Sequence, residues 1–218
     1  MAFVGVTKAD TVNDYKKTCD AGVAEGCFML GVMYDEGQGV KQDHFAAADL
    51  YKKACDGGNA IGCFGLGSLY DEGDGVKQDN FVAADWYKKA CDGGVAEGCY
   101  SLGYGYYNGV GVKQDYFAAA DWYKKACDGR DAKGCGMLGI MYYEGKGVKQ
   151  DYVAAAVWHK KACDSREAGS CIMLGLMYKY GQGVRQNTQK ALELYGQGCD
   201  MREQRGCDAY AELKKKGR

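Results

Sequence analysis

The sequence predicts an all-α protein, a solenoid of stacked helix pairs, and three observations carry this prediction. Twelve cysteines form six pairs whose members stand eight residues apart, and each pair recurs after 36 residues. The string GVKQD occurs four times with the same period, followed by a changed copy, GVRQN. The chain has 34 glycines and no proline. Because a period between about 20 and 50 residues is the signature of a repeat array, we expect one repeat domain over residues 1–218.

Each repeat is expected to contain a helix, a glycine loop and a second helix. In the first repeat, residues 23–35 carry apolar side chains at the i, i+3, i+4 and i+7 positions of one helix face. Gly37 and Gly39 then end this helix. Asp43 is suited to cap a second helix that runs to about Cys55, because its short side chain can accept from free backbone N–H groups.

The two ends of the chain are expected to be caps of the array. Residues 10–20 resemble a second helix alone, and residues 203–218 resemble a first helix with a lysine-rich finish. Terminal units with a polar outer face keep such arrays in solution. The complete repeats are expected at 23–58, 59–94, 95–130, 131–166 and 167–202.

The cysteine spacing predicts disulfides between successive helix pairs. Residues eight apart in one helix are about 12 Å apart, whereas a disulfide needs Cα atoms within roughly 4.4–6.8 Å. The chain must therefore reverse between the two cysteines, and Gly57 and Gly58 are placed to reverse it. Metal binding and reduced buried thiols are the alternatives, but zinc sites usually show shorter Cys spacing, and we expect no metal. The predicted bridges are Cys19–Cys27, Cys55–Cys63, Cys91–Cys99, Cys127–Cys135, Cys163–Cys171 and Cys199–Cys207.

Charge and hydropathy narrow the class of partner and the compartment. The net charge of −1 argues against a dedicated nucleic-acid binder, and no apolar run approaches the roughly 20 residues of a membrane span. Disulfides indicate an oxidising compartment, yet residues 1–10 lack the basic and apolar segments of a secretory leader. We expect a secreted or periplasmic protein whose leader is absent from this sequence. An oxidising organelle space or the cytoplasm is the alternative.

One stretch carries a family resemblance. Residues 66–90 read LGSLYDEGDGVKQDNFVAADWYKKA, a pattern that resembles the Sel1-like repeat, and the cysteine pair in every unit is similar to the Helicobacter cysteine-rich protein family. The resemblance covers about residues 10–216. It implies a right-handed α/α superhelix, secretion, protein–protein recognition and, for some members, penicillin binding with weak β-lactamase activity. A more distant resemblance is to a cysteine-rich assembly factor of the mitochondrial intermembrane space.

Catalytic residues are not evident in the sequence. A serine β-lactamase needs a lysine three residues after its serine, and none of the serines at 68, 101, 165 and 170 has one. His44 and His159 are 115 residues apart and occupy different repeat positions. His159 replaces a tyrosine of the packing series, so we expect a core or edge histidine there. We therefore assign no catalytic residue and expect no cofactor.

A ligand-binding groove is expected along the first helices of the repeats. Three positions of these helices form one stripe beside the core face, and the third repeat places tyrosine at all of them. Tyrosine gives recognition surfaces a large contact area and a hydroxyl group. The resemblance implies that the first helices line the concave side. The predicted partner is a protein or peptide, with a β-lactam or cell-wall fragment as alternative, and the same side chains could instead pack on neighbouring helices. The predicted groove residues are Phe64, Ser68, Tyr100, Tyr104, Tyr107, Ile140 and Tyr143.

Overall fold

The computed structural model describes residues 8–216, and helices joined by short turns and loops make up this range. The all-α fold predicted from the sequence is confirmed. Helices and loops alternate with the expected period of 36 residues, and each of the helices has 13 residues. In chain order they are α1 (Lys8–Asp20), α2 (Ala24–Glu36), α3 (His44–Asp56), α4 (Ala60–Glu72), α5 (Asn80–Asp92), α6 (Ala96–Asn108), α7 (Tyr116–Asp128), α8 (Ala132–Glu144), α9 (Tyr152–Asp164), α10 (Ala168–Tyr180), α11 (Thr188–Asp200) and α12 (Gln204–Lys216).

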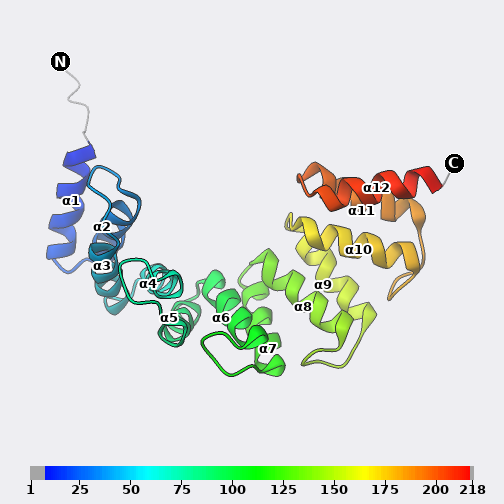
Figure 1. The fold of residues 1–218 in the computed structure, drawn as a ribbon, viewed down its shortest axis with the longest axis horizontal. Coiled ribbons are helices and arrows are strands. Elements are labelled where there is room, and N and C mark those ends of the chain that lie inside the picture. Colours follow the sequence, from blue (N-terminus) through cyan, green and yellow to red (C-terminus); the bar gives the residue numbers. More distant parts are fainter. Residues whose placement is uncertain (1–7, 217–218) are drawn as a thin grey trace, which may run out of the picture. The chain divides into compact units, whose positions relative to one another are not determined.

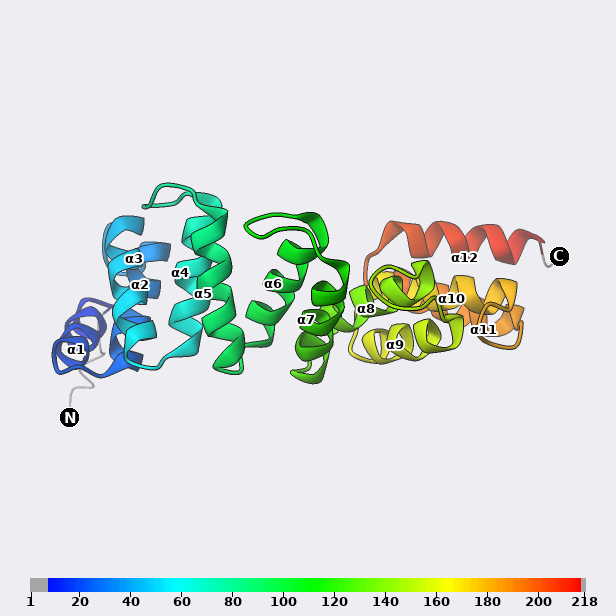
Figure 2. The ribbon, with the colours of Figure 1, turned by 90° about the horizontal axis from the view of Figure 1, so that it is seen from below.

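The helices belong to two compact units, one up to Gln114 with α1–α6 and one from Asp115 onwards with α7–α12. Within the first unit, each helix packs on the next one along the chain, and Figure 1 shows α2 with α3 and α4 with α5 as paired helices. In the second unit, α10 packs on α8 and α12 as well as on its neighbours α9 and α11, a group that Figure 2 shows from another side. The structure thus divides into two compact units, and the single repeat domain expected over residues 1–218 stays a prediction.

The repeated Leu-Gly pair packs the first helix of a repeat against the helices that precede and follow it in the chain. In α4, Leu66 is 2% exposed and packs among Leu69 and the buried residues of α3. The next residue, Gly67, faces the ring of Tyr87 from α5 so closely that an added Cβ would lie 2.8 Å from a ring carbon. The leucine therefore fills the interior, and the missing side chain of the glycine lets the tyrosine ring approach the helix closely.

The second helix of each repeat begins at the acidic or amide residue expected from the sequence. In the first repeat, Asp43 has extended backbone and its side chain accepts a hydrogen bond from the Ala46 N–H at 3.0 Å. This bond satisfies one of the N–H groups that a helix start leaves free. The corresponding capping residues of the later repeats are Asp79, Asp115, Asp151 and Asn187.

All six predicted disulfides are present, and each joins the last turn of one helix to the first turn of the next. Their Cα–Cα distances lie between 4.4 and 4.7 Å. No cysteine within residues 8–216 is free. The chain reverses at two residues between each pair, as at Gly57 and Gly58, where φ changes from −80° to +92°.

Candidate ligand-binding site

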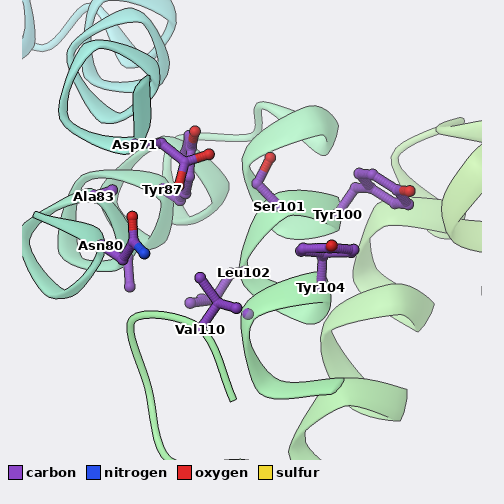
Figure 3. Close-up of a pocket in the computed structure, with 11 residues that line it drawn as sticks. Asp71, Asn80, Ala83, Tyr87, Tyr100, Ser101, Leu102, Tyr104 and Val110 are labelled. Atoms are coloured by element: carbon purple, nitrogen blue, oxygen red, sulfur yellow. The ribbon is translucent and has the colours of Figure 1, made fainter. Parts of the chain in front are cut away.

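A cavity of about 260 Å³ opens in the first unit, beside the end of α4 and between α5 and α6. Figure 3 shows Asp71, Asn80 and Tyr87 on one side of its opening, and Tyr100 and Tyr104 on the other. The cavity brings together three helices and the loop that follows α6. Its lining residues are Asp71, Asn80, Ala83, Ala84, Tyr87, Tyr100, Ser101, Leu102, Tyr104, Gly105 and Val110.

One wall of the cavity consists of hydrogen-bond acceptors and the Tyr87 hydroxyl. Asp71 stands one residue before the end of α4, and Asn80 is the first residue of α5. The Oδ1 atom of Asn80 is buried and has no hydrogen-bond partner among the described residues. Burial, and then the negative charge of Asp71, raise the pKa of Tyr87 well above its usual value, so this hydroxyl stays protonated.

The opposite wall is aromatic and apolar. Tyr100 and Tyr104 lie one turn apart on α6, and the side chain of Tyr104 is 50% exposed. Leu102 is buried, whereas Val110 in the following loop is 37% exposed. A half-exposed tyrosine beside a partly open cavity offers a ligand a large, rigid contact surface.

The lining contains one carboxylate and no lysine, arginine or histidine. Asp71 forms no ion pair in the described part of the chain. The cavity therefore presents an uncompensated negative charge, supported by the buried Asn80 acceptor. Such a wall favours a ligand that donates hydrogen bonds and disfavours an anion.

In the first repeat, the carboxylate at the position of Asp71 has hydrogen-bonding partners within the chain. Asp35 corresponds to Asp71, and His44 corresponds to Asn80. There, His44 Nδ1 lies 2.7 Å from Asp35 Oδ1, and the Tyr51 hydroxyl donates to Asp35 Oδ2 at 3.1 Å. This carboxylate is thus occupied from within the chain.

The predicted groove residues do not all reach one site. Tyr100 and Tyr104 line the cavity, whereas Tyr107 does not. Phe64 packs against Tyr87, with ring centroids 5.6 Å apart, and Ser68 donates a hydrogen bond to Glu72. Phe64 thus contacts a lining residue, and neither Phe64 nor Ser68 lines the cavity itself.

Ile140 and Tyr143 lie on α8, in the second unit. The Tyr143 ring meets Tyr152 edge-on, with centroids 5.1 Å apart, and its hydroxyl donates to Gln182 at 3.0 Å. Tyr143 and Tyr152 occupy the repeat positions of Asp71 and Asn80, so two packed rings replace the acceptors there.

The sequence pattern did not identify Asn80, Ser101 and Val110 as site residues. The available signal was the variation at the position of Asn80, which holds histidine, asparagine, tyrosine or threonine in different repeats. Val110 belongs to a glycine loop whose function in the sequence is to end a helix. Only the folded loop places this valine at the cavity.

The described residues offer no metal centre and no helix that could cross a membrane. Within them, no three His, Cys, Asp or Glu side chains gather as metal ligands. None of the helices is long and apolar enough to span a bilayer. Ser170 and His159, which approach each other in the second unit, are each 1% exposed. A substrate in solution therefore has no access to that hydroxyl in this conformation.

Successive helix pairs that are joined by disulfides and carry a cavity between their helices define an α/α repeat scaffold. A family model described as Sel1 repeat matches residues 24–59, 60–95, 96–131, 132–166 and 168–202. The chain belongs to the Sel1 repeat family. A comparison with curated protein sequences found no match.

Solved structures place the fold among Sel1 repeat proteins. The chain is similar to a protective antigen of uropathogenic Escherichia coli that displays an SLR fold, with 28% identity, a TM-score of 0.87, and coverage of 97% of this chain and 50% of that one. It thus spans half the length of that antigen. A Sel1 repeat protein from Oxalobacter formigenes shares the fold at 23% identity, with a TM-score of 0.82 and coverage of 96% and 90%. Helicobacter pylori cysteine rich protein B is 33% identical over 62% of this chain and 99% of its own, with a TM-score of 0.49.

Proposed function

We propose that this chain is a protein-binding scaffold that holds a segment of a partner polypeptide in the cavity between α5 and α6. The observation that carries the proposal is the cavity itself, about 260 Å³ in volume, with the half-exposed Tyr104 on one side and the Asp71 carboxylate and the unpaired Asn80 oxygen on the other. Aromatic anchors beside a few fixed polar groups are the usual composition of a recognition pocket.

We further propose that the protein works in an oxidising compartment, secreted or periplasmic. The six disulfides support this location, because such bonds persist where thiols are not kept reduced. A partner would then be another extracytoplasmic protein or peptide.

The experiment selects binding peptides from a random displayed library with the oxidised, full-length chain. Affinities are then measured by fluorescence anisotropy for the wild type and for Tyr104→Ala. We expect the Tyr104→Ala change to weaken binding by about tenfold or more, which is about 1.4 kcal/mol, because it removes an aromatic anchor.

Phe81→Ala is the matched control. Phe81 is an exposed aromatic residue in the same unit, 72% exposed, and it does not line the cavity. Binding within about twofold of the wild type is expected for this variant, since a peripheral contact contributes little. Equal affinity of all three proteins would contradict the proposal, as would turnover of a chromogenic cephalosporin that disappears with Tyr104→Ala.

A further inference from the structure

The first and second repeats have an aspartate at the same position, but different residues stand beside it. In the first repeat, the imidazole of His44 lies 2.7 Å from Asp35. In the second, Asn80 stands in place of the histidine and, within the described residues, makes no hydrogen bond to Asp71, while its own Oδ1 is buried without a partner there. The second repeat therefore keeps the acceptors of this arrangement and lacks the nitrogen donor.

The Asp71 carboxylate and the Asn80 oxygen determine which ligands fit the cavity. An anion would be repelled by the charge of Asp71. A purely apolar group would leave the Asn80 acceptor buried and unsatisfied, which costs free energy. A cationic nitrogen with several N–H donors can satisfy Asp71 and Asn80 together. Within residues 8–216, no cationic side chain lines the cavity.

The shape of the cavity favours a slender ligand. The Asn80 oxygen is buried, and the partly exposed Val110 and Tyr104 line the same cavity, so a ligand that fills the cavity meets apolar side chains as well as the acceptor. Figure 3 shows Leu102 and Val110 beside Asn80 in this part of the cavity. Lysine has an unbranched four-carbon stem that suits apolar surroundings and a compact head with three rotatable donors. A guanidinium is wider and planar, and a chain-terminal amine is attached directly to a branched backbone carbon.

We propose that the cavity receives a lysine side chain of the bound polypeptide, with its ammonium group between Asp71 and Asn80. The methylene stem then contacts Leu102 and Val110, and Tyr104 contacts the segment that carries the lysine. This inference rests on the function proposed above and names the residue type that the site recognises. Specificity arises because other side chains leave the charge of Asp71 without a cation, the Asn80 oxygen without a donor, or both.

The test titrates the ¹⁵N-labelled, oxidised full-length chain with Nα-acetyl-lysine N-methylamide and follows the amide signals by NMR. The norleucine analogue has the same stem without the ammonium group, and the arginine analogue has a different cation. We expect lysine to shift the Asn80 side-chain amide and the Ser101 and Tyr104 backbone signals. The norleucine and arginine analogues are expected to bind at least about tenfold more weakly.

Two variants connect this binding to the proposed groups. Asp71→Asn removes the charge and is expected to weaken lysine binding about tenfold or more. Asn80→His copies the residue found at this position in the first repeat, so its imidazole should pair with Asp71 and block lysine while the unit stays folded. Asp35→Asn is the matched control, because it makes the same change at the occupied position, and lysine binding should be unchanged.

The outcomes separate this inference from the function on which it rests. Equal binding of lysine and norleucine, tighter binding of arginine, or an unaltered affinity with Asp71→Asn would overturn the lysine assignment. Library-selected peptides that are weakened by Tyr104→Ala but not by Asp71→Asn would overturn it and leave the scaffold proposal standing. Peptides that are insensitive to both changes would overturn the scaffold proposal itself.

Discussion

The Nδ1 atom of His159 lies 3.3 Å from the Oγ atom of Ser170, in the interior of the second unit. Both residues depart from the repeat, which has tyrosine at the position of His159 and glycine at that of Ser170 in most of its copies. A third departure accompanies them, since Gly136 replaces an aromatic residue, and a Cβ there would lie 2.7 Å from the serine oxygen. The absent ring gives Ser170 its room, and the serine gives the histidine a hydrogen-bond partner.

The buried histidine predicts an acid-sensitive second unit. His159 is 1% exposed, and burial lowers its pKa to about 4, although the charge of Glu167 opposes this shift. The unfolded chain binds a proton near pH 6.5, while the folded chain resists it until about pH 4. Stability is therefore full above pH 6.5 and falls as the pH drops toward 4. Between pH 7 and pH 4.5, the titration of His159 alone should lower the free energy of unfolding by about 2 kcal/mol.

The measurement compares urea unfolding of the wild type with that of His159→Phe at these two pH values. Phenylalanine has a ring of similar size and no proton to gain. The variant should therefore lose about 2 kcal/mol less stability than the wild type between the two pH values. An NMR titration of the histidine ring signals gives the pKa directly. Parallel stability curves for the two proteins would show that His159 is not the acid-sensitive group.

The disulfides predict how many free thiols the protein has and how much stability it loses when one disulfide is removed. Thiol titration of denatured, unreduced protein is expected to find no free thiol, and reduction should release all twelve. The double change Cys127→Ala and Cys135→Ala opens a loop of about nine residues, for which chain entropy gives about 2.5 kcal/mol. Thermal melting of the oxidised variant checks this value. Free thiols in unreduced protein prepared with a thiol trap would contradict the pairing and the proposed compartment.

The sequence predicted the fold well because each structural requirement recurs in register. Leu66, Gly67 and Asp79 each have counterparts in the other repeats, so a helix face, a close ring contact and a helix start could be recognised from their period. The reversal of the chain at Gly57 and Gly58 followed from the distance that a disulfide allows. Repetition made each local signal visible several times.

The site was harder to predict from the sequence, because it depends on the second repeat having asparagine where the first repeat has histidine. Asp71 and Asp35 are the same residue at the same repeat position, and their difference comes from Asn80 and His44 on the following helix. Whether a carboxylate is occupied depends on the distance between side chains of two helices, which a periodic pattern does not contain. The tyrosine stripe suggested the location of the cavity, but not its acceptor wall.

From the second repeat onwards, the second glycine of the loop lies against the start of the second helix of the preceding repeat. Gly75 has φ +68°, and a Cβ on it would lie 2.2 Å from the carbonyl carbon of His44. Gly58, in the turn between repeats, also has a positive φ, +92°, but a Cβ there would meet nothing within 4 Å. The two glycines share the left-handed conformation and differ in the space around them, so they form a matched pair.

Gly75→Ala should therefore destabilise the first unit far more than Gly58→Ala. Both changes place alanine at a positive φ, which costs roughly 1–2 kcal/mol, and Arg130 tolerates such a conformation at the position equivalent to Gly58, with φ 73°. At Gly75 the methyl group also overlaps a backbone that cannot move aside without shifting the helix start, so we expect a total loss of about 3 kcal/mol or more. Urea unfolding monitored by circular dichroism measures both variants. Equal losses would mean that the loop moves away from His44 at little cost, and that contact between repeats does not determine the need for glycine there.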